Sequence, residues 1–171
     1  MKSPSLHIRE AIPSDAKDLL ALKMNYLRTT QTIPLYIEEY ANDRQAEAEL
    51  ILRYQKQANS LLLLTYSDDQ LVGNIDITGN QRQKLQHTAV VGMGVHTAHH
   101  NKGIGAALLQ QTIHWAKTNS ILKILWLEVY SSNCSGIALY TKLGFTKCGT
   151  IPKFFNESSG YVDKHTMYLM V

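Results

Sequence analysis

Near the middle of the chain, a polar turn with two glycines separates an apolar run that ends at Val95 from a segment with helical periodicity. In order, the residues of this turn are His100, Asn101, Lys102, Gly103, Ile104, Gly105 and Ala106. The start of a helix exposes unpaired N–H groups and the positive end of the helix dipole, and glycines let a phosphate come against the backbone. Lys102 and the neighbouring histidines add positive charge or hydrogen-bond donors. The pattern therefore predicts an anion-binding turn that cradles a phosphate.

Two familiar phosphate-binding patterns do not match this turn. A P-loop needs Lys followed by Ser or Thr after its last glycine, and neither Gly103 nor Gly105 has that continuation. The dinucleotide fingerprint needs three glycines in the order GxGxxG, but Gly92 and Gly94 are not followed by the third. What remains is the pattern [R/Q]xxGx[G/A] after a strand, with His100 at the position of Arg or Gln.

A second stretch offers an acid. Asn133 and Tyr140 are seven residues apart in a segment with a helical pattern, so both side chains project from the same face and can point at one ligand. A phenol with an ordinary pKa of about 10 is protonated at neutral pH and can donate its proton to a leaving group. Tyr140 is therefore the candidate general acid. In the other interpretation, its ring packs in the core beneath the sheet.

The same stretch offers a base. Glu128 lies inside an apolar run from Ile124 to Val129, where an unpaired carboxylate would be costly, so it must face water, a partner or a substrate. A carboxylate whose pKa is raised by partial burial can accept a proton from an amine nucleophile, directly or through water. Glu128 is the candidate general base, and a structural salt bridge or an exposed edge position is the alternative.

Taken together, the two stretches resemble the GNAT superfamily of acetyl-CoA-dependent N-acetyltransferases. The first block is the glycine turn, and the second reads LEVxxxNxxxxxLYxKxGF from Leu127 to Phe145. The two blocks follow one another in the superfamily's order and spacing, and the resemblance covers roughly residues 6 to 170. The segment from Thr29 to Asn59 matches only as generic helix, and His100 departs from the first motif.

The resemblance implies a cosubstrate and a reaction. Acetyl-CoA would lie in a gap between the strands over 87–95 and 121–129, and no metal is needed. The reaction would be direct transfer to a primary amine without a covalent acyl-enzyme. In the ribosomal-protein N-terminal acetyltransferase branch, the glutamate that matches Glu128 is the base. The binding residues implied are the backbone near Met93 and Val95 for the pantetheine arm and thioester carbonyl, His100 to Ala106 for the pyrophosphate, and Asn133 and Tyr140.

Histidines and cysteines suggest other chemistry that the spacing does not support. His96, His99 and His100 crowd one turn, but a zinc site needs a fourth ligand and the turn has no cysteine or carboxylate, so we expect no metal and a polar lining of the phosphate pocket. Cys134 and Cys148 have no metal-like spacing and are expected to be reduced thiols of a cytosolic protein. A ping-pong route through Cys134 has little support, since no histidine is paired with it.

Hydrophobic periodicity predicts the elements that position these residues. A strand over Leu6–Ala11 precedes a helix capped by Ser14. One face of that helix carries Ala16, Leu19, Leu20, Met24 and Leu27. Further helices are expected at 42–59, 103–119 and 133–143, and strands at 61–66, 71–77, 87–95, 121–129, 145–151 and 161–171. This order predicts an α/β fold around one mixed sheet. By resemblance it is the GNAT fold, with a mostly antiparallel central sheet flanked by helices on both faces.

Three local features refine that prediction. Gly144 ends the helix over 133–143, as C-terminal glycines commonly do. Gly92 and Gly94 inside a strand suggest a bulge or the close approach of a ligand to the backbone. A polar hairpin loop is expected between the last two strands.

Composition sets the broad class of the protein. The 171 residues suit one domain, 1–171, and 44% are hydrophobic and 18% charged. A formal charge of +3 with no run of Lys and Arg gives no reason to expect nucleic acid as a partner. No apolar stretch approaches the ~20 residues of a membrane span. Charges among the first ten residues interrupt any signal region, so a cytoplasmic location is expected.

The acceptor is the least determined part. In the superfamily it is chosen by segments that correspond to Thr29–Ala41 and Pro152–Gly160. The acidic residues that would attract a cationic amine are Glu38, Glu39, Asp43 and Glu157. A peptide N-terminus, an amino acid, a polyamine and an aminoglycoside all stay open, as does a homodimer. The competing class is a non-catalytic acyl-CoA-binding or regulatory domain of the same fold, which the His100 departure favours.

Overall fold

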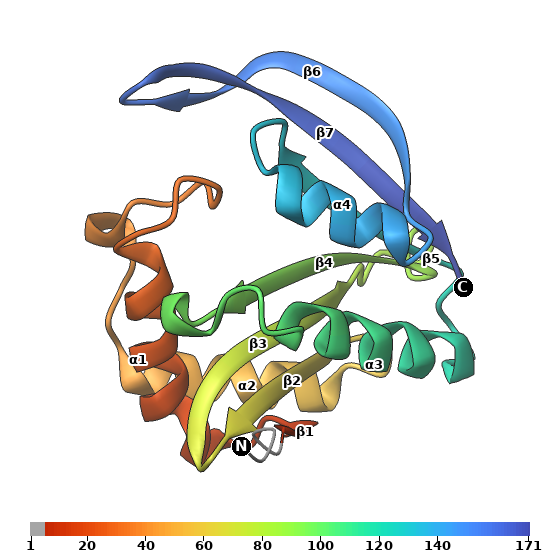
Figure 1. The fold of residues 1–171 in the computed structure, drawn as a ribbon. Coiled ribbons are helices and arrows are strands. Elements are labelled where there is room, and N and C mark those ends of the chain that lie inside the picture. The colour runs from red at the N-terminus through yellow and green to blue at the C-terminus, as the bar shows by residue number, and fades with distance from the viewer. Residues whose placement is uncertain (1–5) are drawn as a thin grey trace.

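The computed structural model describes residues 6–171 (Figure 1). Its strands are β1 (Leu6–Glu10), β2 (Leu61–Ser67), β3 (Gln70–Gly79), β4 (Thr88–Val95), β5 (Ile124–Tyr130), β6 (Thr146–Glu157) and β7 (Gly160–Met170). Its helices are α1 (Ala16–Leu27), α2 (Arg44–Lys56), α3 (Ile104–Thr118) and α4 (Cys134–Lys142). Short 3-10 turns lie at Pro13–Asp15, Ile37–Glu39 and Thr97–His99. Residues 1–5 lie outside the described residues. They belong to the N-terminal segment in which charges argue against a signal peptide.

All the strands form one sheet in the order β1-β2-β3-β4-β5-β7-β6. Every neighbouring pair is antiparallel except β4 and β5, which are parallel. The predicted α/β fold with a mixed, mostly antiparallel sheet and helices on both faces is confirmed. Among the described residues, no helix is both long and apolar enough to cross a membrane.

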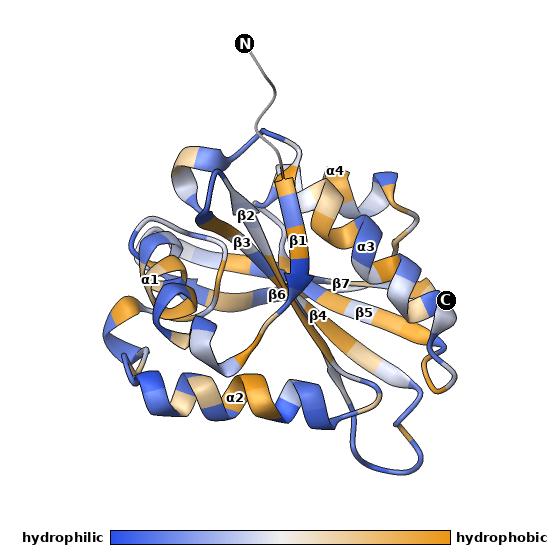
Figure 2. Cartoon of the chain, turned by 90° about the horizontal axis from the view of Figure 1, so that it is seen from below, coloured by the Kyte–Doolittle hydropathy of each residue, from blue (hydrophilic) through white to orange (hydrophobic). Residues whose placement is uncertain are grey.

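β2 shows how the sequence builds a core on each face of the sheet. Its four consecutive leucines alternate in direction, as strand side chains do. Leu61 and Leu63 belong to the core that α3 and α4 cover, and Leu62 and Leu64 belong to the core under α1 and α2. A continuous apolar run is therefore needed where a strand is buried on both faces. Figure 2 shows apolar residues running along β4 and β5 as well, whereas the surrounding loops are largely hydrophilic.

The parallel pairing of β4 with β5 is short. It joins only Thr88 with Ile124, Ala89 with Leu125 and Val90 with Trp126. β4 nevertheless keeps its register with β3 as far as Val95, and β5 keeps its register with β7 as far as Tyr130. The two middle strands therefore separate, and each follows its own antiparallel partner.

Gly92 and Gly94 of β4 are explained by neighbouring side chains, not by the bulge or ligand approach that the sequence suggested. The β3–β4 register has no shift, so there is no bulge at this point. A Cβ at Gly94 would lie 2.2 Å from Cε1 of Tyr26, and a Cβ at Gly92 would lie 2.9 Å from Oδ1 of Asp76. Side chains of α1 and β3, rather than a ligand, take the space that a larger residue in β4 would need.

The expected helix cap and hairpin loop are both wrong in detail. Ser14 lies inside the 3-10 turn, and Asp15 is the N-cap residue of α1. β6 does not end before Pro152 but continues to Glu157, so the hairpin turn is shorter than predicted. An irregularity after Ile151 accommodates Pro152, and Lys153, with φ of 53°, donates its N–H to Oδ1 of Asp163 at 2.8 Å.

A partly buried ion pair joins β1 to the start of α1. Both terminal nitrogens of Arg9 donate to Asp15, at 2.7 Å each, and the N–H of Ile12 donates to the same carboxylate at 2.8 Å. Burial alone would raise the pKa of Asp15, but the hydrogen bonds from Arg9 and Ile12 outweigh burial and lower it.

We predict that Asp15→Asn lowers the free energy of unfolding at pH 7 by about 2 kcal/mol, because charged hydrogen bonds are lost. The native pKa of this carboxyl is lower than the unfolded one. The ionised Asp15 therefore contributes fully to the free energy of unfolding above an unfolded pKa of about 3.9. This contribution is lost as the pH falls through the native pKa. Urea unfolding at pH 7 and pH 3 should show the wild type and the variant converging at the lower pH. An equal difference in the free energy of unfolding between wild type and variant at pH 7 and pH 3 would contradict this role of Asp15.

Candidate functional site

The candidate site lies where β4 and β5 separate. His96 donates its N–H to Val72 on the β3 side at 2.8 Å. Because N–H groups along a strand alternate between its two edges, the N–H groups of Met93 and Val95 point to the other edge. β5 is no longer paired with β4 at that height. The structure therefore leaves the backbone of both predicted residues facing the opening.

The glycine turn delivers an uncapped helix end beside this opening. α2 is capped by the side chain of Asp43 and α4 by that of Asn133, but the N-cap of α3 is Gly103. Gly103 has φ of 81°, and Asn101 also adopts a left-handed conformation. No side chain caps the first-turn N–H groups of α3, which have no partner within the helix. Such groups are suited to an anion.

The residues around the turn are not equally available. Asn101, Lys102 and Gly103 are exposed, whereas the side chain of Ile104 is buried in the core and can offer only its backbone. The ring Nε2 of His100 lies 3.0 Å from the carbonyl oxygen of Val95, so this side chain folds back onto the end of β4.

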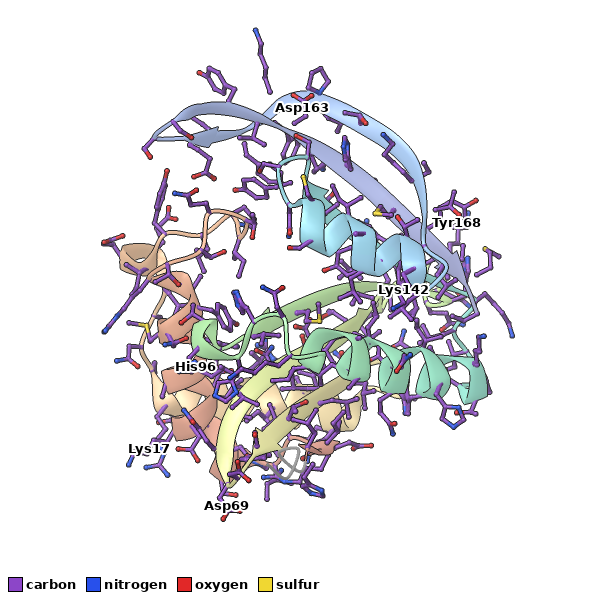
Figure 3. All side chains as sticks on the ribbon, viewed as in Figure 1. Lys17, Asp69, His96, Lys142, Asp163 and Tyr168 are labelled. Atoms are coloured by element: carbon purple, nitrogen blue, oxygen red, sulfur yellow. The ribbon has the colours of Figure 1, made fainter. Side chains whose placement is uncertain are left out.

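The other two histidines stay on the connection between β4 and α3. His96, labelled in Figure 3, accepts the N–H of Ala98 through Nδ1 and meets His99 edge to face. Burial and the charge of Lys102 lower the pKa of His99. Residues 6–171 contain no group of three or more His, Cys, Asp or Glu residues arranged to hold a metal.

α4 closes the site from the second side. A Cβ at Gly105 would lie 3.3 Å both from Cδ2 of Leu139 and from Cε of Met93, so the glycine lets α3, α4 and β4 meet. Asn133 accepts the N–H of Gly136 at 2.9 Å, which makes its side-chain oxygen the cap of α4. Its amide nitrogen makes no hydrogen bond within residues 6–171 and is left as a free donor for the predicted ligand contact.

Tyr140, on α4, combines a partly buried ring with an unused hydroxyl. The ring packs against the core and lies 5.9 Å, centroid to centroid, from the ring of Phe145. Its hydroxyl has no hydrogen-bond partner in the described part of the chain, and burial raises its pKa to about 12. A phenol in this state keeps its proton at any physiological pH, as an acid must.

Glu128 is the exposed member of an ion pair, which is the alternative that the sequence left open without identifying the partner. Its Oε1 lies 2.6 Å from Nζ of Lys164 on β7, and its side chain is 41% exposed against 8% for Lys164. Glu128 follows Trp126, the last β5 residue paired with β4, and so lies where the strands have separated. Lys164 was missed because lysine is rarely buried, and its neighbours in β7 give no sign that this one is.

The two segments expected to choose the acceptor come together. The hydroxyl of Tyr36 donates to the carbonyl of Asn156 at 3.5 Å. Two of their acidic side chains accept hydrogen bonds within the protein: Glu39 from the N–H of Tyr36, and Glu157 from the hydroxyl of Tyr130 at 2.6 Å. Asp43, just beyond the first segment, caps α2. These neutral donors leave the negative charges in place, so the expected attraction for a cationic amine stays a prediction.

A polar cluster behind β4 was not predicted. The Nζ of Lys23 lies 2.6 Å from Oε1 of Glu47, and Oε2 of Glu47 accepts a hydrogen bond from the hydroxyl of Tyr40. Asp76 accepts the hydroxyl of Tyr54 at 3.1 Å, and burial raises its pKa. The cluster is formed by side chains of α1, α2 and β3 that are distant in sequence, so no local pattern indicated it.

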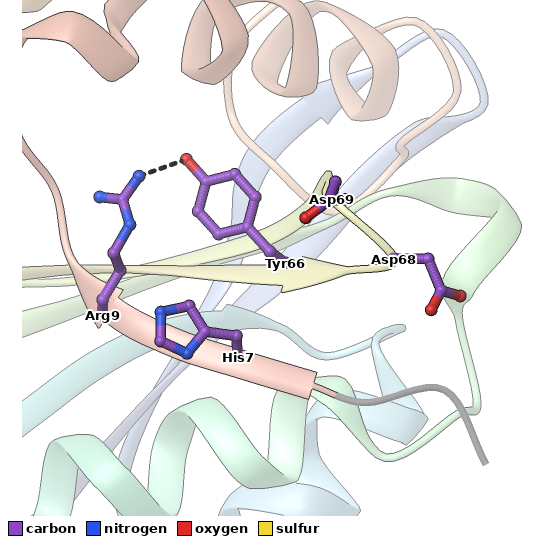
Figure 4. A pocket seen from close by; sticks show the side chains of 5 residues that line it. All are labelled: His7, Arg9, Tyr66, Asp68 and Asp69. Carbon is purple, nitrogen blue, oxygen red and sulfur yellow. Dashed lines mark hydrogen bonds between the residues drawn. The ribbon is translucent and has the colours of Figure 1, made fainter. Parts of the chain in front are cut away.

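A separate hollow of about 510 Å³ lies at the β1–β2 edge (Figure 4). It is lined by His7, Arg9, Tyr66, Asp68 and Asp69. The hydroxyl of Tyr66 accepts a hydrogen bond from Arg9 at 2.9 Å, and the same guanidinium holds Asp15. Because its cation is already paired and it lies at the other end of the strand order from β5, this hollow does not contribute to the candidate site.

Comparison with known sequences agrees with the geometry. The model of the acetyltransferase (GNAT) family matches residues 26–145. The chain is 30% identical over 105 residues to the L-amino acid N-acetyltransferase AaaT of Escherichia coli K12, covering 61% of this chain and 65% of that one. It is 30% identical over 87 residues to the ribosomal protein bS18-alanine N-acetyltransferase of Salmonella typhimurium, covering 51% and 58%. The matches thus span less than two thirds of either relative.

Solved structures extend the likeness over nearly the whole chain. A GNAT-family acetyltransferase from Streptococcus pneumoniae has a TM-score of 0.94 and 26% identity, covering 98% of this chain and all of that one. YncA from Salmonella typhimurium, solved with acetyl-CoA, has a TM-score of 0.85 and 20% identity, covering 96% and 93%. The second likeness shows the fold alone.

The raised pKa of Tyr140 can be tested without a substrate. In a spectrophotometric titration of tyrosinate, the difference between wild type and Tyr140→Phe should be a transition centred near pH 12, above the value of about 10 for an exposed tyrosine. The same difference taken with Tyr161→Phe, which removes an exposed phenol, is the control. A Tyr140 transition centred near pH 10 would show that the ring is not buried as described.

Proposed function

The chain belongs to the GNAT acetyltransferase family, and from that premise we propose that it transfers an acetyl group from acetyl-CoA to a primary amine. The observation that carries the proposal is the opening between β4 and β5, with two strand N–H groups facing it and the uncapped end of α3 beside it. A long narrow ligand that carries phosphates at one end and an acyl group at the other fits this arrangement.

The proposed contacts use the backbone more than side chains. Acetyl-CoA would supply the acetyl group as an activated thioester. The N–H groups of Met93 and Val95 would hold the pantetheine arm and the thioester carbonyl. The first turn of α3, from Ile104 to Ala106, would hold the pyrophosphate. Lys102 adds a positive charge at the same place, and His100, whose Nε2 is held on the carbonyl of Val95, keeps its other ring nitrogen for the ligand.

The proposed proton transfers use two side chains on neighbouring elements. Glu128 accepts a proton from the incoming amine, directly or through water. Its Oε1 is held by Lys164, and its Oε2 makes no hydrogen bond within residues 6–171, so Oε2 is the oxygen that takes the proton. Tyr140 keeps its proton until the leaving thiolate needs it, because burial raises its pKa.

The first experiment measures CoA release from acetyl-CoA with four amines: L-methionine, a peptide that begins with alanine, spermidine and kanamycin. With the best acceptor, Tyr140→Phe and Glu128→Gln should each lower kcat by about 100-fold, because general acid or base catalysis is lost. The KM for acetyl-CoA should change little, since neither change alters the backbone contacts. Tyr161→Phe and Glu49→Gln, two exposed residues outside the site, are the matched controls.

The competing function has a distinct result in the same assay. A protein that binds acetyl-CoA but releases no CoA with any of the four amines would be a non-catalytic acyl-CoA-binding domain. The side chain of His100 held on Val95 is the observation that favours this second candidate.

The glycine turn is tested separately by calorimetric titration of acetyl-CoA. Lys102→Ala and His100→Ala should each weaken binding by about fivefold to tenfold, as expected when one charged or polar phosphate contact of about 1 kcal/mol is lost. Lys84→Ala, which removes a charge from the loop after β3, should leave the affinity unchanged. An unaltered Kd for His100→Ala would end its proposed phosphate role.

A further inference from the structure

Lys164 and Glu128 form an ion pair whose two side chains differ in exposure, and this difference bears on catalysis. On β7, Thr166 lies opposite Glu128, and Lys164 lies opposite Tyr130. Residues two apart on a strand share a face, so Glu128 and Lys164 are diagonal neighbours on the face toward α1 and α2. The lysine is almost fully buried, whereas the carboxylate keeps contact with solvent.

Three aromatic rings, those of Phe154, Phe155 and Tyr130, form a wall beside Lys164. Its Nζ lies 3.8 Å from the ring centroid of Phe154, which meets Phe155 edge to face. Phe155 in turn stacks on Tyr130 with ring centroids 3.7 Å apart. A buried ammonium needs a partner, and Glu128 is the carboxylate within 4.0 Å that the described residues supply. The wall therefore determines where one carboxylate oxygen of Glu128 is held.

We propose that Lys164 is a positioning residue that holds Glu128 in the geometry needed to take the proton of the amine. This inference rests on the proposed function, in which Glu128 is the base. An exposed glutamate side chain samples several rotamers, and a fixed contact at Oε1 removes that freedom while leaving Oε2 to face the amine. Small displacements of a reacting group are costly in rate, so the contact should matter for kcat rather than for binding.

The test is a double-mutant cycle in the full chain, with the best acceptor of the four amines and saturating acetyl-CoA. Lys164→Met, which keeps much of the side-chain volume without the charge, should lower kcat at least tenfold and leave the KM for acetyl-CoA within twofold. Lys164→Arg should restore most of the loss. In the Glu128→Gln background, Lys164→Met should change kcat by less than twofold, because the positioned group is already absent.

Lys147→Met is the matched control, since it removes an exposed lysine from β6 next to the same strand. Thermal unfolding of each variant separates a lost contact from a lost fold. If Lys164→Met is too unstable to assay, Lys164→Gln takes its place in the cycle with the same expectations.

The outcomes distinguish this inference from the proposed function. A wild-type kcat for Glu128→Gln would remove the base and the inference together. A large loss for Glu128→Gln with kcat within twofold of wild type for Lys164→Met would overturn the positioning role alone. Equal losses from Lys164→Met in both backgrounds would show a structural role that does not act through Glu128, and would also overturn it.

Discussion

The separation of β4 from β5 is the constraint on which the rest of the site depends. β4 stays paired with β3 as far as Val95 and β5 with β7 as far as Tyr130, while the parallel pairing between them stops at Val90 and Trp126. Two backbone edges are thereby left open inside a folded sheet, where unpaired N–H groups would normally be costly. α3 and α4 begin next to this opening, and Gly105 allows them to approach β4. A ligand that supplies acceptors for these groups completes the sheet.

The features of the site that follow from local spacing could be predicted from the sequence. The glycine turn, the helix it opens and the strand before it are each coded by neighbours within a few residues. Gly144 adopts φ of 95° after α4, as its position after a helical pattern indicated. The placement of Tyr140 on α4 and of Glu128 on β5 follows in the same way, because periodicity alone assigns a residue to an element.

Features that depend on contacts distant in sequence could not be predicted. Lys164 is buried against Phe154 of β6 and Glu128 of β5, and no pattern within β7 indicates those contacts. Gly92 and Gly94 suggested a ligand, but the side chains that need the space come from β3 and α1. Asp15, not Ser14, stands at the N-cap of α1, and its side chain pairs with Arg9 of β1 instead of capping the helix, which again is a tertiary contact.

The most direct measurement is amide hydrogen exchange by NMR with and without acetyl-CoA. Unpaired N–H groups exchange fast, and a ligand that accepts their hydrogen bonds protects them. The account predicts that acetyl-CoA slows exchange at Met93 and Val95 and in the first turn of α3, and leaves the β1–β2 edge unchanged. Protection confined to other parts of the chain, or none at saturating acetyl-CoA, would contradict the claim that the opening between β4 and β5 is the cosubstrate site.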